Sequence, residues 1–156
     1  GTFIGVMNIE DFESSALYGL RLAYHLSETF FFEANIGMAE AGETSAEKLG
    51  NFIVLSDSER DYLYYSFGVA YNLPGETYVN DYAFNTNFYL SMGIGATDFA
   101  DDTRLTGSFG AGYQFLVNDW LALHVAAKQH LYKIDLLGED KMSFNTEFST
   151  GISFFF

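Results

Sequence analysis

The sequence predicts an all-β fold: an eight-stranded antiparallel transmembrane β-barrel of the up-and-down type, with both termini periplasmic. Apolar residues alternate with small or polar residues at a period of two in eight successive segments, as in strands with two different faces. Most segments reach the roughly 9–11 residues that a strand needs to cross a bilayer. One face is aromatic and apolar while the other is rich in Gly, Ser and Asn, which suits a crowded polar lumen. We expect residues 1–156 to form this single domain.

The first segment, residues 2–12, alternates least regularly, and we expect the set of Phe3, Gly5, Met7 and Ile9 to face outward. The pattern is clearest in residues 16–26, where every even-numbered residue is apolar or aromatic. It restarts after a short polar break and then recurs along the chain. The remaining expected strands cover residues 30–38, 62–71, 84–96, 104–115, 121–132 and 144–156.

The apolar face is interpreted as lipid-facing because it carries no acidic residue in seven of the eight segments. Hydrocarbon does not tolerate open sheet edges, so strands of this kind must close into a barrel. The chain contains no run of about 18 apolar residues, which argues against a transmembrane helix. Aromatic residues near the expected strand ends predict girdles at the two membrane interfaces. These residues are Tyr18, Tyr24, Tyr65, Tyr71, Tyr113 and Trp120.

The composition excludes several classes of protein. Seven Lys and Arg residues against 21 Asp and Glu give a net charge of −14, which excludes nucleic-acid binding through a basic face. The absence of cysteine excludes a disulfide scaffold and any Cys-based metal or redox site. The 17 Phe and 11 Tyr residues argue against disorder, because disordered chains are poor in aromatic residues.

The connections between the expected strands alternate in length. Residues 27–29 and 117–119 form tight turns, and the longer link 73–83 holds the single proline, Pro74. Residues 40–61, 98–103 and 134–142 are longer and polar, and a short helix is expected within 39–50. Short periplasmic turns and longer external loops are typical of outer-membrane barrels. We therefore expect residues 40–61, 98–103 and 134–142 to lie outside the cell.

The acidic residues are concentrated in these expected outer segments. Together with residues 10–15, the segments hold fifteen of the 21 acidic residues but only three basic ones. The carboxylates are expected to be solvated or to join the layer of divalent cations between lipopolysaccharide phosphates. Residues 98–102 do not match a calcium-binding loop, and we expect no resident metal or cofactor. The acidic outer rim comprises Asp57, Glu59, Asp61, Asp98, Asp101, Asp102, Asp135, Glu139 and Asp140.

Four charged residues, Arg21, Glu33, Lys128 and Glu147, fall on the inward set. An unpaired charge in the lumen is costly, so each requires a partner; Arg104, Tyr64 and Tyr89 offer further polar contacts. Eight strands enclose room only for side chains or one small ligand. We expect a fixed, salt-bridged plug, and the alternative is a gate or a cation path.

All three histidines, His25, His124 and His130, also fall on the inward set. Histidine binds zinc in many proteins, but His124 and His130 are six positions apart, or about 20 Å along a strand. The two rings are therefore too far apart to share one metal ion. We expect hydrogen-bonded interior histidines.

Some eight-stranded barrels modify lipids, which requires a Ser–His pair and an acidic residue near the outer rim. No His-x-Ser sequence occurs in this chain. His124 is expected near the periplasmic end of its strand, and His130 is expected to point inward. We therefore expect no catalytic residues.

The last strand ends in an aromatic residue preceded by outward residues at every second position. This ending resembles the C-terminal signal through which the barrel assembly machinery recognises outer-membrane barrels. The residues of this assembly signal are Phe148, Ile152, Phe154 and Phe156.

The C-terminal part, residues 62–156, resembles a more specific group. Five pieces carry the resemblance: LPGE at 73–76, NDWLALH at 118–124, HLY at 130–132, DLLG at 135–138 and GISFFF at 151–156. They are similar to the "outer membrane beta-barrel domain" family of myxobacteria and gammaproteobacteria, small barrels of the size of OmpA or OmpX. The resemblance implies a fold and a location in the Gram-negative outer membrane. It implies no activity, and no functional residues are transferred from it.

These observations predict a non-enzymatic membrane anchor or structural component of an envelope assembly. The expected partners are outer-membrane lipid and lipopolysaccharide, the barrel assembly machinery during biogenesis, and other envelope proteins. One alternative is a barrel that binds or transports a small apolar molecule and releases it laterally into the membrane. A further alternative is a lipid-modifying enzyme.

Overall fold

The computed structural model describes residues 1–10, 14–40, 61–79, 82–99, 102–136 and 139–156. Among these described residues, no helix is long and apolar enough to span a membrane. The strands are β1 (Thr2–Asn8), β2 (Ser14–His25), β3 (Phe30–Glu40), β4 (Asp61–Val79), β5 (Tyr82–Phe99), β6 (Asp102–Asn118), β7 (Leu121–Leu136) and β8 (Glu139–Phe154).

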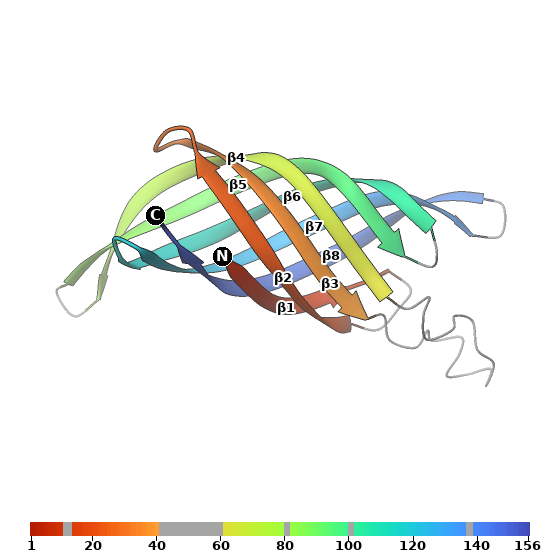
Figure 1. Ribbon diagram of the computed structural model, residues 1–156, viewed down its shortest axis with the longest axis horizontal. Coiled ribbons are helices and arrows are strands. Elements are labelled where there is room, and N and C mark those ends of the chain that lie inside the picture. Colours follow the sequence, from red (N-terminus) through yellow and green to blue (C-terminus); the bar gives the residue numbers. More distant parts are fainter. Residues whose placement is uncertain (11–13, 41–60, 80–81, 100–101, 137–138) are drawn as a thin grey trace.

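The eight strands form one closed barrel in chain order, and every neighbouring pair is antiparallel (Figure 1). β1 closes the ring because it pairs with both β2 and β8: Phe3 lies opposite Gly19 on one side and Gly151 on the other. Closure leaves no open sheet edge along the wall. The predicted eight-stranded up-and-down barrel is confirmed.

The two ends of the barrel differ. The N- and C-termini lie at the same end as the β2–β3 turn, and we call this end the terminal rim (Figure 1). The opposite end, which carries the β3–β4, β5–β6 and β7–β8 connections, is called the distal rim.

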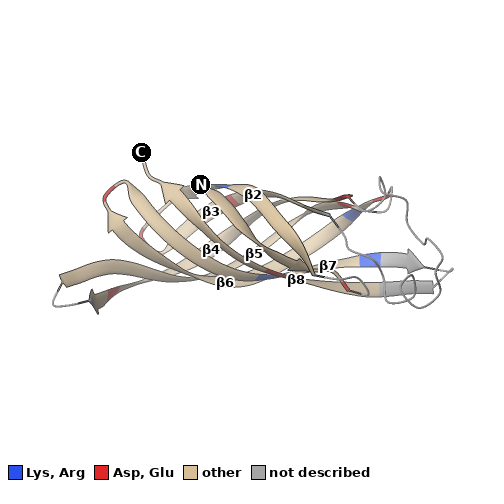
Figure 2. Ribbon diagram, turned by 90° about the horizontal axis from the view of Figure 1, so that it is seen from below, with Lys and Arg blue, Asp and Glu red and all other residues tan. Residues whose placement is uncertain are grey.

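The alternation predicted for β2 to β8 is confirmed by the exposure of the side chains. Outward residues such as Leu20, Phe67 and Ile94 are 60%, 58% and 68% exposed, whereas Tyr64 and Tyr89 on the inward set are each 1% exposed. In Figure 2, long stretches of the strands carry no charged residue. The tyrosines expected in the girdles and Trp120 all lie on the outer face, with exposed fractions between 38% and 68%. The barrel therefore presents an apolar, aromatic outer wall.

The predicted outward face of β1 is wrong. Phe3, Met7 and Ile9 are buried in the lumen, whereas Ile4 and Val6 are 65% and 47% exposed on the outside. The reason is that the lumen beside this strand also holds a cluster of apolar side chains, so both faces of β1 carry hydrophobic residues. Hydrophobicity alone therefore does not distinguish the two faces of β1.

The two tight turns at the terminal rim are confirmed, and side chains stabilise both. The Ser27 hydroxyl accepts hydrogen bonds from the backbone N–H groups of Thr29 at 3.3 Å and Phe30 at 3.1 Å. At the β6–β7 turn, Asn118 Oδ1 accepts the Trp120 N–H at 3.1 Å. Ser and Asn favour such turns because their side chains bond to the nearby backbone.

Three segments expected to be loops are extensions of the strands. Pairing continues to Val79 opposite Tyr82 at the terminal rim, and to Phe99 opposite Asp102 and Leu136 opposite Glu139 at the distal rim. In a barrel that crosses a membrane, the parts of the strands beyond the lipid need no apolar face, yet their backbone groups can still pair with each other. Of the expected helix at 39–50, the first two residues belong to β3, and the others lie outside the described residues.

Candidate functional site

Four charged side chains from four different strands meet inside the barrel. Arg21 on β2, Glu33 on β3, Lys128 on β7 and Glu147 on β8 are all less than a tenth exposed. Each strand directs its charged residue inward because the neighbours on either side face outward. The four residues predicted to point into the lumen are thus buried in the structure.

Glu33 lies between the two cations. Its carboxylate accepts a hydrogen bond from Lys128 Nζ at 2.7 Å and forms a salt bridge with Arg21 Nη2 at 3.2 Å. β3 and β7 are four strands apart in a ring of eight, so they lie on opposite walls. The Glu33–Lys128 pair therefore bridges the full width of the lumen.

Glu147 is the centre of a second bridge across the lumen. Tyr64 donates its hydroxyl to Glu147 Oε2 at 2.6 Å, from β4 on the wall opposite β8. Glu147 also contacts His130 Nε2 at 3.1 Å and accepts the Ser149 hydroxyl at 2.8 Å. Three groups thus surround this carboxylate, which removes the main cost of burying it.

Arg21 connects the network to the aromatic wall of the lumen. Its Nη1 donates to the Tyr89 hydroxyl at 2.8 Å, and its guanidinium carbon lies 4.6 Å from the centre of the Tyr89 ring. Glycine makes the two bridging tyrosines fit: a Cβ at Gly37 would overlap the Tyr64 ring, and one at Gly112 would overlap that of Tyr89. Small residues on the inward set therefore leave the space that the large polar side chains fill.

The distal half of the lumen is closed by apolar side chains rather than by charges. Tyr62 packs against Phe99 with ring centres 5.7 Å apart, and Met7, Ile9 and Leu17 complete the same buried cluster. The alternation places Tyr62 and Leu17 on the inward set, whereas Met7 and Ile9 are among the residues expected to face outward. The lumen thus consists of a polar layer followed by an apolar layer.

The structure brings five of the seven predicted interior residues into two adjacent clusters, one around Glu33 and one around Glu147, whose members Lys128 and Glu147 lie opposite each other on β7 and β8. His124 and His25 lie apart from these clusters. The His124 side chain is buried beside Gly151, with its Nδ1 3.4 Å from the Ser153 hydroxyl. His25 lies at the terminal rim between the rings of Phe31 and Phe155, whose centres are 5.0 and 5.9 Å away. Arg104, expected to support the network, instead forms a salt bridge with Asp102 at 3.0 Å.

His124 and Ser153 do not form a catalytic triad. Among the described residues, His124 has no hydrogen bond or ion pair with an acidic side chain that would orient its ring. A nucleophilic serine needs both a base and an orienting group. The described residues also contain no group of three or more His, Asp and Glu side chains that could hold a metal ion.

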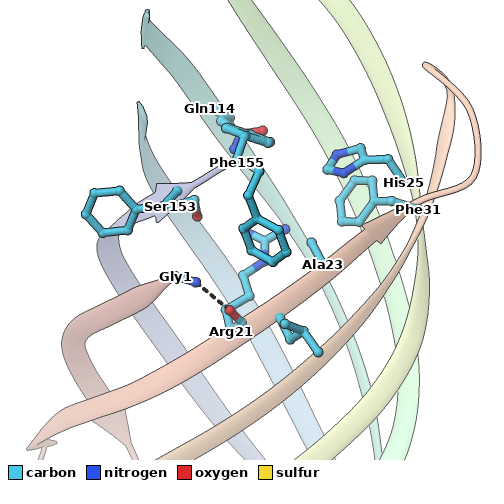
Figure 3. Close-up of a pocket in the computed structure, with 11 residues that line it drawn as sticks. Gly1, Arg21, Ala23, His25, Phe31, Gln114, Ser153 and Phe155 are labelled. Carbon is cyan, nitrogen blue, oxygen red and sulfur yellow. Dashed lines mark hydrogen bonds between the residues drawn. The ribbon is translucent and has the colours of Figure 1, made fainter. Parts of the chain in front are cut away.

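A small cavity lies between the polar network and the terminal rim. It has a volume of about 60 Å³ and is lined by His25, Phe31, Gln114, Ser153 and Phe155, among others (Figure 3). Two water molecules occupy about this volume, since each takes about 30 Å³ in the liquid. The cavity is much smaller than the roughly 300–1,000 Å³ of typical ligand pockets.

The predicted acidic rim is only partly within the described residues. Asp61 and Asp98 are exposed at the distal rim, where Asp102 also lies, bound to Arg104. Asp135, Glu139 and Asp140 occupy the paired ends of β7 and β8, and their side chains are outside the described part. Asp57, Glu59 and Asp101 lie outside it altogether.

Comparison with solved structures shows which proteins share this architecture. Neisserial surface protein A aligns over 99% of this chain and 93% of its own, with a TM-score of 0.56 and 12% sequence identity. The chain shares the eight-stranded barrel fold of this protein. The outer-membrane protein Ail, the attachment invasion locus protein of Yersinia pestis, also aligns over 99% of the chain. Its crystal and nanodisc structures give TM-scores of 0.47 and 0.46, with 12% and 15% identity, and 93% and 97% of those chains are covered.

No protein-family model matches the sequence. The search of curated proteins also finds no match. The closed eight-stranded barrel of the structure supports the small barrel that the resemblance described above implies. Membership of the outer membrane beta-barrel domain family stays a prediction.

Proposed function

We propose that the protein is a non-enzymatic barrel of the Gram-negative outer membrane that acts as an anchor or structural component of an envelope assembly. The observation that carries this proposal is the pair of polar bridges that cross the lumen, Glu33–Lys128 and Tyr64–Glu147. A barrel closed in this way has no continuous aqueous path, while its apolar outer wall matches a lipid environment. Such a barrel can hold other molecules at a fixed position in the membrane by binding them at its two rims.

The alternative of a transport or binding barrel has less support. A solute entering at the terminal rim meets a cavity of about 60 Å³ and then the polar layer. The third alternative, a lipid-modifying enzyme, lacks a complete catalytic group in the described residues, as shown for His124 and Ser153. Display of the rims is therefore the function that the geometry supports best.

The C-terminal strand supports insertion by the barrel assembly machinery. Phe148, Ile152, Phe154 and Phe156 all face outward, with exposed fractions of 60%, 41%, 56% and 114%. Apolar side chains at alternate positions at the end of the last strand are accessible before the barrel is embedded in lipid. We propose that they form the signal for this machinery.

We propose that the terminal rim faces the periplasm and the distal rim faces outward. Because the chain has no cysteine, a single introduced cysteine is the only thiol that a membrane-impermeant maleimide can modify. Asp98 at the distal rim and Glu28 at the terminal rim are both exposed. We expect Asp98→Cys to be labelled on intact cells and Glu28→Cys only after the outer membrane is permeabilised. Labelling of Glu28→Cys alone on intact cells would reverse the orientation.

The anchor role predicts an envelope protein that binds the connection between β3 and β4. Extraction in a mild detergent should retain this partner in stoichiometric amount. Replacing residues 41–60 by a short Gly–Ser linker should release it while leaving the barrel folded, as judged by a shift in gel migration between heated and unheated samples. If the wild-type protein is extracted without any stoichiometric partner, the anchor proposal fails even though the barrel stands.

A further inference from the structure

Near the distal rim the wall of the barrel separates between β6 and β7. The pairing of β6 with β7 ends at Gly107 opposite Leu131, although β6 begins at Asp102 and β7 continues to Leu136. Beyond this point β6 pairs only with β5 and β7 only with β8, as far as the ends of those hairpins. The β5–β6 and β7–β8 hairpins thus diverge, and we call the opening between them the β6–β7 seam (Figure 1).

A groove follows the β6–β7 seam. It has a volume of about 440 Å³ and is lined by Arg104, Leu105, Leu131, Tyr132, Lys133 and Met142. Leu105 is 80% exposed and Met142 is 45% exposed. The groove is therefore open to the outside of the barrel and has an apolar floor.

The charges at the groove are unusual for this chain. Its net charge is −14, yet two of the lining residues are basic. Two of the other basic side chains that the structure describes, Arg21 and Lys128, lie inside the lumen, and the side chain of Lys141 on β8 is outside the described part. Arg104 contacts the Asp102 carboxylate at 3.0 Å and the Phe99 carbonyl at 3.3 Å, and Lys133 is exposed. Even with Asp102 included, these three side chains carry a net positive charge.

The β6–β7 seam also indicates where the membrane ends on this side. Backbone N–H and C=O groups that lack a partner strand are costly in hydrocarbon, so the shared pairing must extend at least to the headgroup region. The point of separation, Gly107 and Leu131, therefore lies no deeper in the membrane than the headgroup region. The groove begins at this point of the wall, where exposed apolar side chains suited to acyl chains lie beside basic side chains suited to headgroups.

We propose that the β6–β7 seam binds one anionic, phosphate-bearing lipid from the surrounding leaflet. An acyl chain lies along Leu105, Leu131 and Met142, and the phosphate contacts Lys133 and Arg104, competing with Asp102 for the guanidinium. Charge complementarity favours this occupant, because basic side chains at the membrane interface attract anionic headgroups. The inference rests on the barrel lying in a membrane but not on which rim faces outward.

Native mass spectrometry of the full chain released from detergent micelles tests this site with dioleoylphosphatidylglycerol as the probe. We expect the wild type to retain one such lipid and the double variant Arg104→Gln, Lys133→Gln to bind it about ten-fold more weakly. The matched control is Lys48→Gln, Arg60→Gln, which makes the same change in net charge at two residues that are not among the described residues lining the groove. Leu105→Ser should also weaken retention, because the acyl chain loses its apolar contact.

Further binding measurements distinguish other molecules that could occupy the groove. Dioleoylphosphatidylcholine at the same concentration should be retained less, and millimolar inorganic phosphate should not displace the anionic lipid. Equal binding by the groove variant and the wild type, or equal weakening in the control, would overturn the proposal. Displacement of the lipid by phosphate would indicate a site for free anions. A peptide bound in place of lipid would indicate that a strand inserts at the β6–β7 seam. Either result would also reject the lipid-binding proposal.

A shift in gel migration between heated and unheated samples shows that each variant is folded before its lipid binding is measured. The single variant Lys133→Gln changes only an exposed side chain, so it is a second test of the groove that leaves the barrel folded. Loss of lipid binding leaves the partner and labelling experiments unaffected. Failure of this inference is therefore distinguishable from failure of the proposed function.

Discussion

Replacing Glu33 by glutamine is expected to lower the free energy of unfolding by about 3–5 kcal/mol. The substitution removes the only carboxylate within salt-bridge distance of both Arg21 and Lys128 in the described lumen. Two buried cations then lose the carboxylate that both of them contact. Urea unfolding of the barrel in phospholipid vesicles, followed by the fluorescence of Trp120, measures the change.

The matched control is Asp98→Asn, which makes the same change in charge at an exposed position of the distal rim. Its effect should lie within about 0.5 kcal/mol of zero. If Glu33→Gln is no more destabilising than Asp98→Asn, the polar layer does not stabilise the barrel in the way its contacts indicate.

Introducing a charge on the outer wall should have an effect of similar size. Phe109 lies in the middle of β6 and is 56% exposed on the outer face. If this face is embedded in hydrocarbon, Phe109→Arg is expected to cost about 2–4 kcal/mol, because arginine near the bilayer midplane is that unfavourable. The same vesicle unfolding experiment measures it.

Tyr82 provides the comparison for this substitution. It is 73% exposed and lies at the terminal rim, where β5 pairs with β4 but no longer with β6. This position is beyond the closed wall of the barrel. Tyr82→Arg should cost no more than about 1 kcal/mol. Similar costs at the two positions would mean that the apolar band does not mark the depth of the bilayer.

Much of the fold is predictable from the sequence because the two faces of most strands differ in polarity. From β2 to β8, apolar side chains such as Leu20 and Phe67 lie on the outside, as expected for a barrel in lipid, so the period of two directly gives the orientation. The rule fails at β1, where Met7 faces an apolar part of the lumen while Val6 faces outward. Where both environments are apolar, the alternation no longer identifies the outside.

The limits of the strands are harder to predict for a related reason. Residues 134–142 are polar, which is typical of a loop, yet Leu136 still pairs with Glu139 in the structure. Outside the bilayer nothing requires an apolar face, whereas backbone pairing remains favourable. The polarity of a segment therefore shows where the membrane ends, and the strand continues beyond that point.

Predicting which residues fill the lumen is possible, but predicting which of them meet is not. The inward positions of Glu33, Lys128 and Glu147 follow from local alternation. The contact between Tyr64 and Glu147 joins residues 83 positions apart. It depends on how the ring closes and on the stagger of its strands, and no single strand carries that information. The same holds for the β6–β7 seam, which arises from the divergence of two hairpins.

Side chains that cross the lumen seal the barrel against the passage of ions. The current through planar lipid bilayers that contain the folded wild-type protein measures this seal. Folding is checked beforehand by heat-modifiable migration. The polar bridges Glu33–Lys128 and Tyr64–Glu147, with the apolar layer beyond them, predict no current steps above the leak of the protein-free bilayer. Reproducible single-channel steps from the wild-type protein would contradict it.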